Sequence, residues 1–149
     1  MTLQERVESA MRDAMRARDD QRTQTLRMAM AAAHNQRIAL RRDLTDDEVV
    51  DVLSRQVKQR RESIGMYRDA GHLDRAAAEE AEAAILAEFL PEQLSEDEIE
   101  SLARAAISEA GASSPADLGR VMGRLSPRTK GRADGRAVSE VVRRLLAGG

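Results

Sequence analysis

Apolar residues recur every three or four positions along most of this 149-residue chain, which is the period of an amphipathic helix. Near the N-terminus, Leu3, Val7 and Met11 fall on one face of a helix that we expect to end near residue 18. No stretch alternates apolar with polar residues as a half-buried strand does. The pattern therefore predicts an all-α protein.

Three helix starts are marked by capping boxes, in which a Ser or Thr hydroxyl and a Glu carboxylate three residues later each accept the other residue's backbone amide hydrogen. The boxes begin at Thr2, Thr45 and Ser95, so helices are expected to start directly after these residues. Periodicity, together with Gly and Pro at helix ends, supplies the other limits. The sequence predicts helices at about 3–18, 20–42, 46–70, 73–90, 96–110, 115–125 and 135–147.

The predicted helices fall into two groups. The segment FLPEQLS, residues 89–95, separates four helices from three, and Pro91 within it ends the fourth helix. We expect residues 1–91 to form an N-terminal four-helix unit made of two helical hairpins. Residues 92–149 are expected to form a C-terminal three-helix bundle.

The spacing also predicts two details of packing. In the second helix, Leu26, Met30 and Ile38 are expected to face the core. In the sixth helix, the Gly119-x-x-x-Gly123 spacing is interpreted as a close contact with a neighbouring helix, because glycine lets two backbones approach.

Composition limits the class of protein. Aromatic residues make up 1% of the chain, so Leu, Ile, Val, Met and Ala have to build the core. The absence of cysteine excludes disulfides and cysteine-ligated metals. The N-terminus carries acids where a signal peptide needs an apolar run, and the longest apolar stretch, MAMAAA at 28–33, is too short to span a bilayer. A cytoplasmic protein with no membrane association is therefore expected.

The chain offers few groups for catalysis. Its two histidines, His34 and His72, are isolated and lack the spacing of a metal site. The acidic runs at 46–48 and 96–98 lie in first helical turns, where carboxylates offset the helix dipole. The glycine motifs that bind phosphates in nucleotide enzymes are absent. We expect no catalytic residue, no metal and no cofactor.

Charge is distributed unevenly along the predicted C-terminal bundle. Residues 91–116 carry six acids and one base, whereas residues 117–149 carry three acids and eight bases. This asymmetry indicates an anionic partner for the C-terminal part. The bases are densest in SPRTKGRADGR, residues 126–136, directly before the last helix.

Two interpretations of this basic loop are open. Asp134 is predicted to cap the last helix, which leaves the following amides at a helix end that attracts anions. Gly131 and Gly135 would let another backbone approach, and Arg132 and Arg136 could make forked contacts to phosphate. Alternatively, the loop is a capped turn with solvated arginines, and the charge of Asp134 opposes a nearby phosphate. The residues alone favour the capped turn.

The order and spacing of four segments resemble the YqeY family over nearly the whole chain. The segments are TLRMAMAAAHNQRI, LTDDEVVDVLSRQVKQRRESI, EFLPEQLSEDEIE and LGRVMGRLSPRTKGRADGRAVSEVV. The C-terminal part also resembles the tail of the B subunit of the tRNA-dependent Asp/Glu amidotransferase, in which Gly-x-Val-Met leads to Lys-Gly and a last helix. The matching residues here are Gly119, Val121, Met122, Lys130 and Gly131. Those tails tend to carry Asn-Pro where this chain has Asp134-Gly135.

The resemblance implies an all-helical fold of two units and a C-terminal bundle that binds tRNA. It carries over no catalytic residue, because the phosphorylating and transamidating centre of the B subunit belongs to its larger N-terminal domain. A carbon–nitrogen ligase activity with glutamine as donor would be inherited from the tail by name alone. The residues expected to contact RNA are Arg124, Arg128, Lys130, Gly131, Arg132, Gly135, Arg136 and Arg143.

Three functions are open at this point. The first is a non-catalytic adaptor that binds tRNA by backbone and shape, since a chain with almost no aromatic residues is poorly equipped to stack splayed bases. The second is a helical protein-interaction module whose partner is an amidotransferase or an aminoacyl-tRNA synthetase. The third is an enzyme that acts on tRNA or glutamine.

Overall fold

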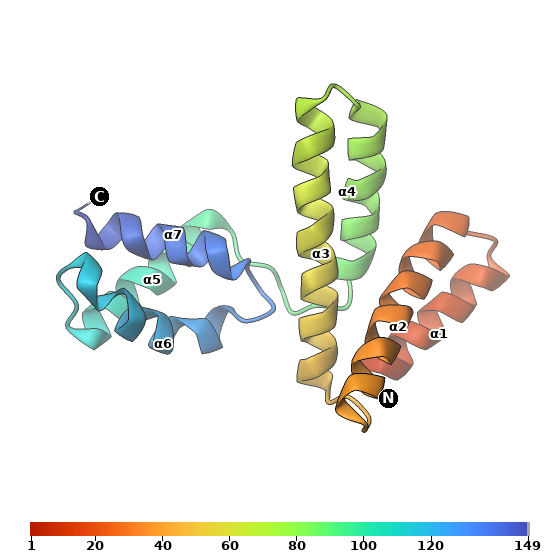
Figure 1. Cartoon of the computed structure of the whole chain (residues 1–149), viewed down its shortest axis with the longest axis horizontal. Coiled ribbons are helices and arrows are strands. Elements are labelled where there is room, and N and C mark those ends of the chain that lie inside the picture. Colours follow the sequence, from red (N-terminus) through yellow and green to blue (C-terminus); the bar gives the residue numbers. More distant parts are fainter. Residues whose placement is uncertain (149) are drawn as a thin grey trace. The chain divides into compact units, whose positions relative to one another are not determined.

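The computed structural model of the chain describes residues 1–148, and all regular elements among them are helices (Figure 1). The all-α class predicted from periodicity is confirmed. The chain divides into two compact units, Met1–Leu90 and Pro91–Gly149, each with its own core. The helices are α1 (Leu3–Arg16), α2 (Asp20–Leu40), α3 (Asp46–Asp69), α4 (Leu73–Ala87), α5 (Glu96–Ala110), η1 (Pro115–Asp117), α6 (Leu118–Thr129) and α7 (Gly135–Leu146).

The first unit consists of two antiparallel helical hairpins, α1–α2 and α3–α4 (Figure 1). Its core draws on all four helices and includes Val7, Leu26, Leu53 and Leu86, each at most 2% exposed. Burial of one such side chain contributes about 1.5–3 kcal/mol. The two hairpins are therefore stabilised against each other by a shared apolar core.

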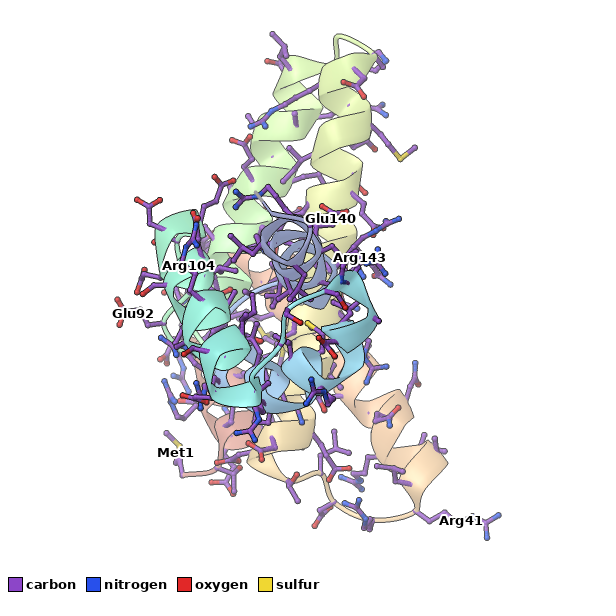
Figure 2. The ribbon with its side chains drawn as sticks, turned by 90° about the vertical axis from the view of Figure 1, so that its left-hand side faces the viewer. Met1, Arg41, Glu92, Arg104, Glu140 and Arg143 are labelled. Carbon is purple, nitrogen blue, oxygen red and sulfur yellow. The ribbon has the colours of Figure 1, made fainter. Side chains whose placement is uncertain are left out.

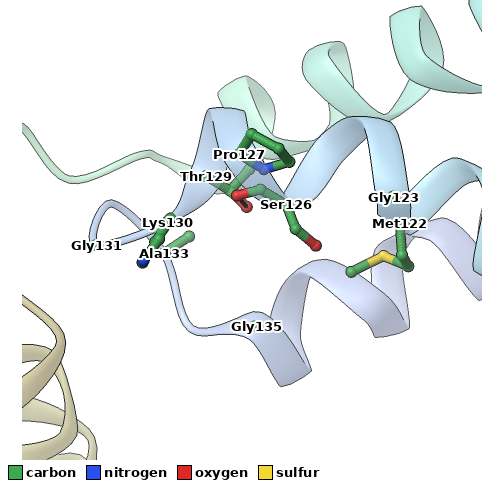
Figure 3. Close-up of a pocket in the computed structure, with 9 residues that line it drawn as sticks. All are labelled: Met122, Gly123, Ser126, Pro127, Thr129, Lys130, Gly131, Ala133 and Gly135. Carbon is green, nitrogen blue, oxygen red and sulfur yellow. Dashed lines mark hydrogen bonds between the residues drawn. The ribbon is translucent and has the colours of Figure 1, made fainter. Parts of the chain in front are cut away.

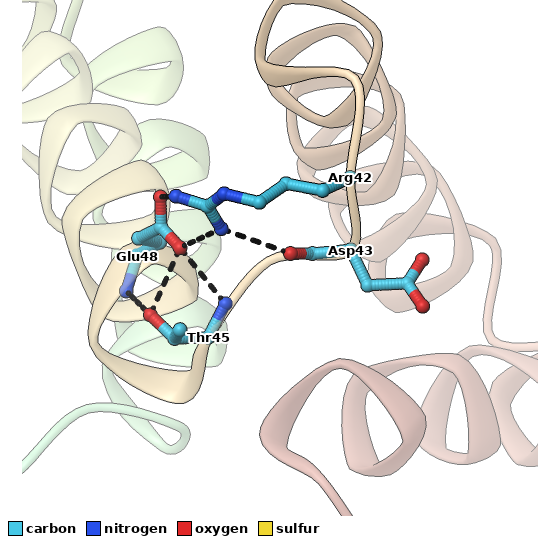
Figure 4. A network of polar contacts seen from close by, with 4 residues as sticks. All are labelled: Arg42, Asp43, Thr45 and Glu48. Atoms are coloured by element: carbon cyan, nitrogen blue, oxygen red, sulfur yellow. Dashed lines mark hydrogen bonds and ion pairs between the residues drawn. The ribbon is translucent and has the colours of Figure 1, made fainter.

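The turn between the two hairpins is fixed by a polar cluster (Figure 4). The capping box at Thr45 forms as predicted, and Glu48 also pairs with Arg42 through hydrogen bonds of 2.7 and 2.9 Å. The Arg42 guanidinium, followed by the Thr45 amide, lowers the pKa of Glu48 from its ordinary 4.5 to about 2. Asp46, one residue further along, accepts a 3.0 Å hydrogen bond from the Leu3 amide and so joins the start of α1 to that of α3.

A charged side chain, Arg60 of α3, lies in the core of the first unit and is 6% exposed. Its Nε lies 3.5 Å from Oε2 of Glu82 on α4. Its other nitrogens reach Gln56 at 3.3 Å and the sulfur of Met28 on α2 at 3.9 Å. Arg60 follows the buried Val57 by three residues, so helical spacing places it on the inward face of α3.

Ile38 is not in the core, contrary to the prediction, because it is 61% exposed. The buried positions of α2 end at Ala33. Ile38 follows the buried Leu26 by twelve residues, which places it about 120° around the helix from that side chain. Ile38 therefore lies outside the buried face of α2, which ends at Ala33.

The second unit is a bundle of α5, α6 and α7, with η1 leading into α6 (Figure 1). Its core contains Ala103 and Ala106 of α5, Leu125 of α6, and Val138 and Val142 of α7, all 0% exposed. Because two of these residues are alanines, α6 and α7 can approach the backbone of α5 closely. The short connection from Thr129 to Gly135 keeps the end of α6 and the start of α7 together at one end of the bundle.

Glu48→Gln is expected to flatten the dependence of stability on pH between about pH 4.5 and 2. The pKa of Glu48 is lowered in the fold. Its carboxylate therefore stabilises the protein above pH 4.5 and loses this contribution as the pH falls toward 2. Urea unfolding midpoints of wild type and variant at pH 7, 4 and 2.5 measure the effect. High salt should reduce the difference between the two proteins, since the Arg42–Glu48 pair is near the surface. If the unfolding midpoint changes equally with pH in both proteins, the prediction is wrong.

Glu82→Ala is expected to destabilise the first unit more than Arg60→Met does. The first change leaves a buried guanidinium without its carboxylate, whereas the second removes the buried charge and keeps much of the volume. Loss of one partner of a fully buried pair costs about 3–5 kcal/mol. The loss should be smaller here, because the Glu82 side chain is 27% exposed. Thermal unfolding compares the two variants, and a greater loss from Arg60→Met would show that the packing of Arg60 outweighs its charge.

Candidate nucleic-acid interface

A groove of about 780 Å³ lies where the end of α6 faces the start of α7 (Figure 3). Small-molecule pockets have volumes of about 300–1,000 Å³, so the groove is large enough for a ligand group. Met122 and Ser126 point from α6 into the space between the helices, and Lys130 lies at the loop end. The lining residues are Met122, Gly123, Ser126, Pro127, Thr129, Lys130, Gly131, Ala133 and Gly135.

Helix α6 continues to Thr129, beyond the end that was predicted at Leu125. Pro127 lies in its last turn, and since proline has no amide hydrogen, the carbonyl of Gly123 lacks the donor that a helix normally gives it. Thr129 is buried, and its hydroxyl donates to the carbonyls of Leu125 at 3.5 Å and Ser126 at 3.4 Å. The prediction was wrong because the burial of Thr129 outweighs one lost hydrogen bond near a helix end.

Gly119 and Gly123 do not mediate a contact between helices of this chain, contrary to the prediction. Both are exposed, and a Cβ added at either position would meet no atom within 4 Å. They leave a strip of α6 backbone without side chains, and Gly123 also borders the groove.

The loop between α6 and α7 is held by the segment that precedes α5. The Leu94 amide donates to the Arg132 carbonyl at 2.8 Å, and the Gln93 side chain donates to the Gly131 carbonyl at 2.8 Å. Arg132 also donates from Nε to the Glu92 carbonyl at 3.2 Å. Arg132 therefore helps to hold the loop in place. The RNA contact predicted for Arg132 stays a prediction. Gln93 was not anticipated, because no periodic pattern marks a polar loop residue.

Asp134 is the N-cap of α7, and its Oδ1 accepts a hydrogen bond from the Arg136 amide at 3.2 Å. Gly131 has a φ of +73°, which lets the chain turn after α6. Gly135 is exposed and leaves open space where a side chain would stand. Because the Asp134 carboxylate occupies the helix end, an anion bound here has to be held by side chains.

Several bases of the second unit are paired with acids of α5. Arg128 lies 2.6 Å from Glu109, and Arg144 lies 3.8 Å from Glu100. The Arg128 guanidinium lowers the pKa of Glu109, with a smaller contribution from the charge of Arg124. The charge asymmetry along the sequence is therefore partly neutralised across the bundle.

Three of the predicted residues, Arg124, Arg136 and Arg143, are exposed, and Arg136 and Arg143 form no ion pair among the described residues, whereas the charge of Arg124 acts on Glu109. Arg136 and Arg143 lie on the same face of α7 by helical spacing. Glu140 lies close to Arg143, and Figure 2 shows both on the opposite side of the unit from Arg104 of α5. The acid between the two arginines reduces the positive field of this face.

The structure places several predicted residues at the groove. Lys130 lines it together with the glycines at 131 and 135. Arg124 and Arg136 each directly follow a groove residue, Gly123 and Gly135 respectively. The lining of the groove is therefore mainly apolar, with one basic residue, Lys130, at its loop end.

The two histidines belong to different hairpins of the first unit. His34 is exposed on α2, and His72 stands edge-on to Tyr67 at the turn between α3 and α4, with ring centroids 6.4 Å apart. Within residues 1–148, no three His, Cys, Asp or Glu side chains gather as a metal site requires. In the same part of the chain, no helix has the length and apolar character needed to cross a bilayer.

Asp134→Ala is expected to lower the free energy of unfolding of the second unit by about 1 kcal/mol, because α7 loses its side-chain cap. Asp134→Asn should retain most of the stability, since an amide oxygen also caps a helix. Thermal unfolding followed by circular dichroism measures both variants. An equal loss in the two would show that the charge of Asp134, and not its cap, stabilises the loop.

This chain is similar to one protein family over nearly its whole length and to one yeast protein over part of it. Residues 4–146 match the YqeY family, described as Yqey-like protein. An uncharacterized protein of Schizosaccharomyces pombe is 30% identical over 93 residues, which are 62% of this chain and 76% of the relative. The family match includes both helical units and the groove. The chain therefore belongs to the YqeY family.

Proposed function

We propose that the C-terminal unit binds tRNA and that the chain is a non-catalytic adaptor. The observation that carries the proposal is a groove lined by Lys130 in a unit whose arginines at 124, 136 and 143 are exposed, with Arg136 one residue after the lining residue Gly135. The resemblance of this unit to the tail of the amidotransferase B subunit supports tRNA as the polyanion.

Binding would rest mainly on the phosphate backbone. A guanidinium offers forked N–H donors that match phosphate oxygens, and Arg136 and Arg143 have no ion pair among the described residues to give up. Arg124 has no close ion pair there either, but it would lose its attraction to Glu109. Arg128 would have to leave Glu109 first. We therefore assign the direct contacts to Arg124, Arg136 and Arg143, and supporting roles to Arg132 and to Lys130, which already has an interaction of its own.

A second function, docking on a protein, is favoured by the surface of the first unit. Its large apolar side chains Met28, Ile38, Met66 and Leu73 are between 56% and 72% exposed. Each of these side chains could contribute to a protein contact, and a contact that used several of them would bury a substantial apolar area. The partner we propose for this unit is an amidotransferase or an aminoacyl-tRNA synthetase. Affinity capture before and after nuclease treatment separates the two functions, because a docked protein survives removal of RNA.

The third function, a carbon–nitrogen ligase with glutamine as donor, rests on the resemblance of the tail alone. A glutaminase and transamidation assay on the purified chain tests it. Robust turnover would contradict the adaptor proposal.

Binding of the purified chain to tRNA is expected to weaken roughly 10²-fold between 50 and 200 mM salt if about four phosphates are engaged. The combined variant Arg124→Gln, Arg136→Gln and Arg143→Gln should bind more weakly and show a shallower salt slope, since fewer counterions are released. Asp134→Asn should bind more tightly, because it keeps the cap and removes the opposing charge. Filter binding at several salt concentrations measures all three proteins.

The matched control is Arg12→Gln, Arg27→Gln and Arg55→Gln, which removes the same charge from exposed arginines of the first unit. It should bind tRNA nearly as well as wild type. The proposal fails if wild type has no affinity for tRNA, or if the two triple variants weaken binding equally.

A further inference from the structure

The floor of the groove is suited to a different group from phosphate. Met122, Pro127 and Ala133 present apolar surface, whereas a phosphate requires hydrogen-bond donors. The polar side chains of the groove are few: Ser126, Lys130 at the loop end, and Thr129, whose hydroxyl already donates within α6. A flat, mainly apolar group with a polar edge fits this arrangement.

We infer that the groove holds one unpaired nucleobase of the bound RNA, while the neighbouring arginines hold its flanking phosphates. This inference rests on the proposed RNA-binding function and adds a preference for RNA with a base out of the stack. The argument for this occupant is charge complementarity: Lys130 lines the groove at its loop end, and Arg136 is exposed one residue after the lining residue Gly135, so phosphates that flank a bound base can meet basic side chains.

The lining can contact a base without an aromatic residue. A methionine sulfur makes favourable contacts with aromatic rings, and Met122 extends along the space between α6 and α7 (Figure 3). The Ser126 hydroxyl can donate or accept at a base edge. The scarcity of aromatic residues in the sequence therefore does not exclude this single-base contact.

The space for the base depends on glycine. Gly123 lies on the α6 wall, and a Cβ there meets no atom within 4 Å, so a larger side chain enters the groove without disturbing the fold. Gly123→Leu also replaces glycine by a residue with higher helix propensity. Gly65 of α3 offers a matched control, because it too is helical, exposed and free of neighbours within 4 Å of a Cβ.

The test compares two RNA hairpins that differ by one bulged nucleotide, each titrated with wild type, Gly123→Leu and Gly65→Leu at constant salt. A methionine sulfur contributes less to an aromatic ring contact than an aromatic side chain does, so wild type and Gly65→Leu should prefer the bulged hairpin by roughly two- to tenfold. Gly123→Leu should bind both hairpins as weakly as wild type binds the fully paired one. Circular dichroism confirms that both variants are folded.

The outcomes separate this inference from the proposed function. If wild type binds both hairpins equally, or Gly123→Leu keeps the preference, the base-binding inference is overturned while RNA binding stands. If wild type binds neither hairpin nor tRNA, both are overturned. Capture of a helical protein partner that Gly123→Leu abolishes, with RNA binding unchanged, would also overturn the inference, because the groove would then belong to a protein.

Discussion

The hydrogen bonds between the segment before α5 and the α6–α7 loop hold the candidate interface in place. Leu94, Gln93 and Arg132 supply them, with two bonds at 2.8 Å and one at 3.2 Å. Each hydrogen bond of this kind contributes about 0.5–1.5 kcal/mol, and ordering one loop residue costs about 1–2 kcal/mol. The contacts thus offset part of the cost of fixing a short loop that contains glycine. A ligand that binds there meets walls that are already ordered, which reduces the entropy lost on binding.

The charges of the second unit serve both its fold and its proposed partner. Ion pairs from α6 and α7 to the acids of α5 use part of the basic charge within the bundle, as Arg128 does with Glu109. Such exposed pairs contribute little to stability individually. Their effect on binding is larger, because they leave only some of the bases directed at solvent. The proposed RNA contacts are therefore concentrated at the groove and along one face of α7.

The helices were predictable from the sequence because capping boxes and apolar periodicity are local signals. Thr45 and Ser95 cap helices that begin at the next residue, as predicted. Two predictions were wrong because tertiary packing determines these features. Helix α6 continues past Pro127 to the buried Thr129, and Ile38 lies outside the buried face of α2. At the interface, the sequence identified the basic loop and the cap at Asp134. It could not identify the groove, which depends on the distance between two helices, or the long-range contact from Gln93.

Hydrogen–deuterium exchange of the full chain with and without tRNA tests the central proposal most directly, because it locates the bound surface without any substitution. The account predicts that tRNA slows exchange in the second half of α6, the loop that follows it and the first turns of α7. It predicts little change in α1–α4. Protection confined to the first unit, or no protection at a tRNA concentration that saturates filter binding, would contradict it.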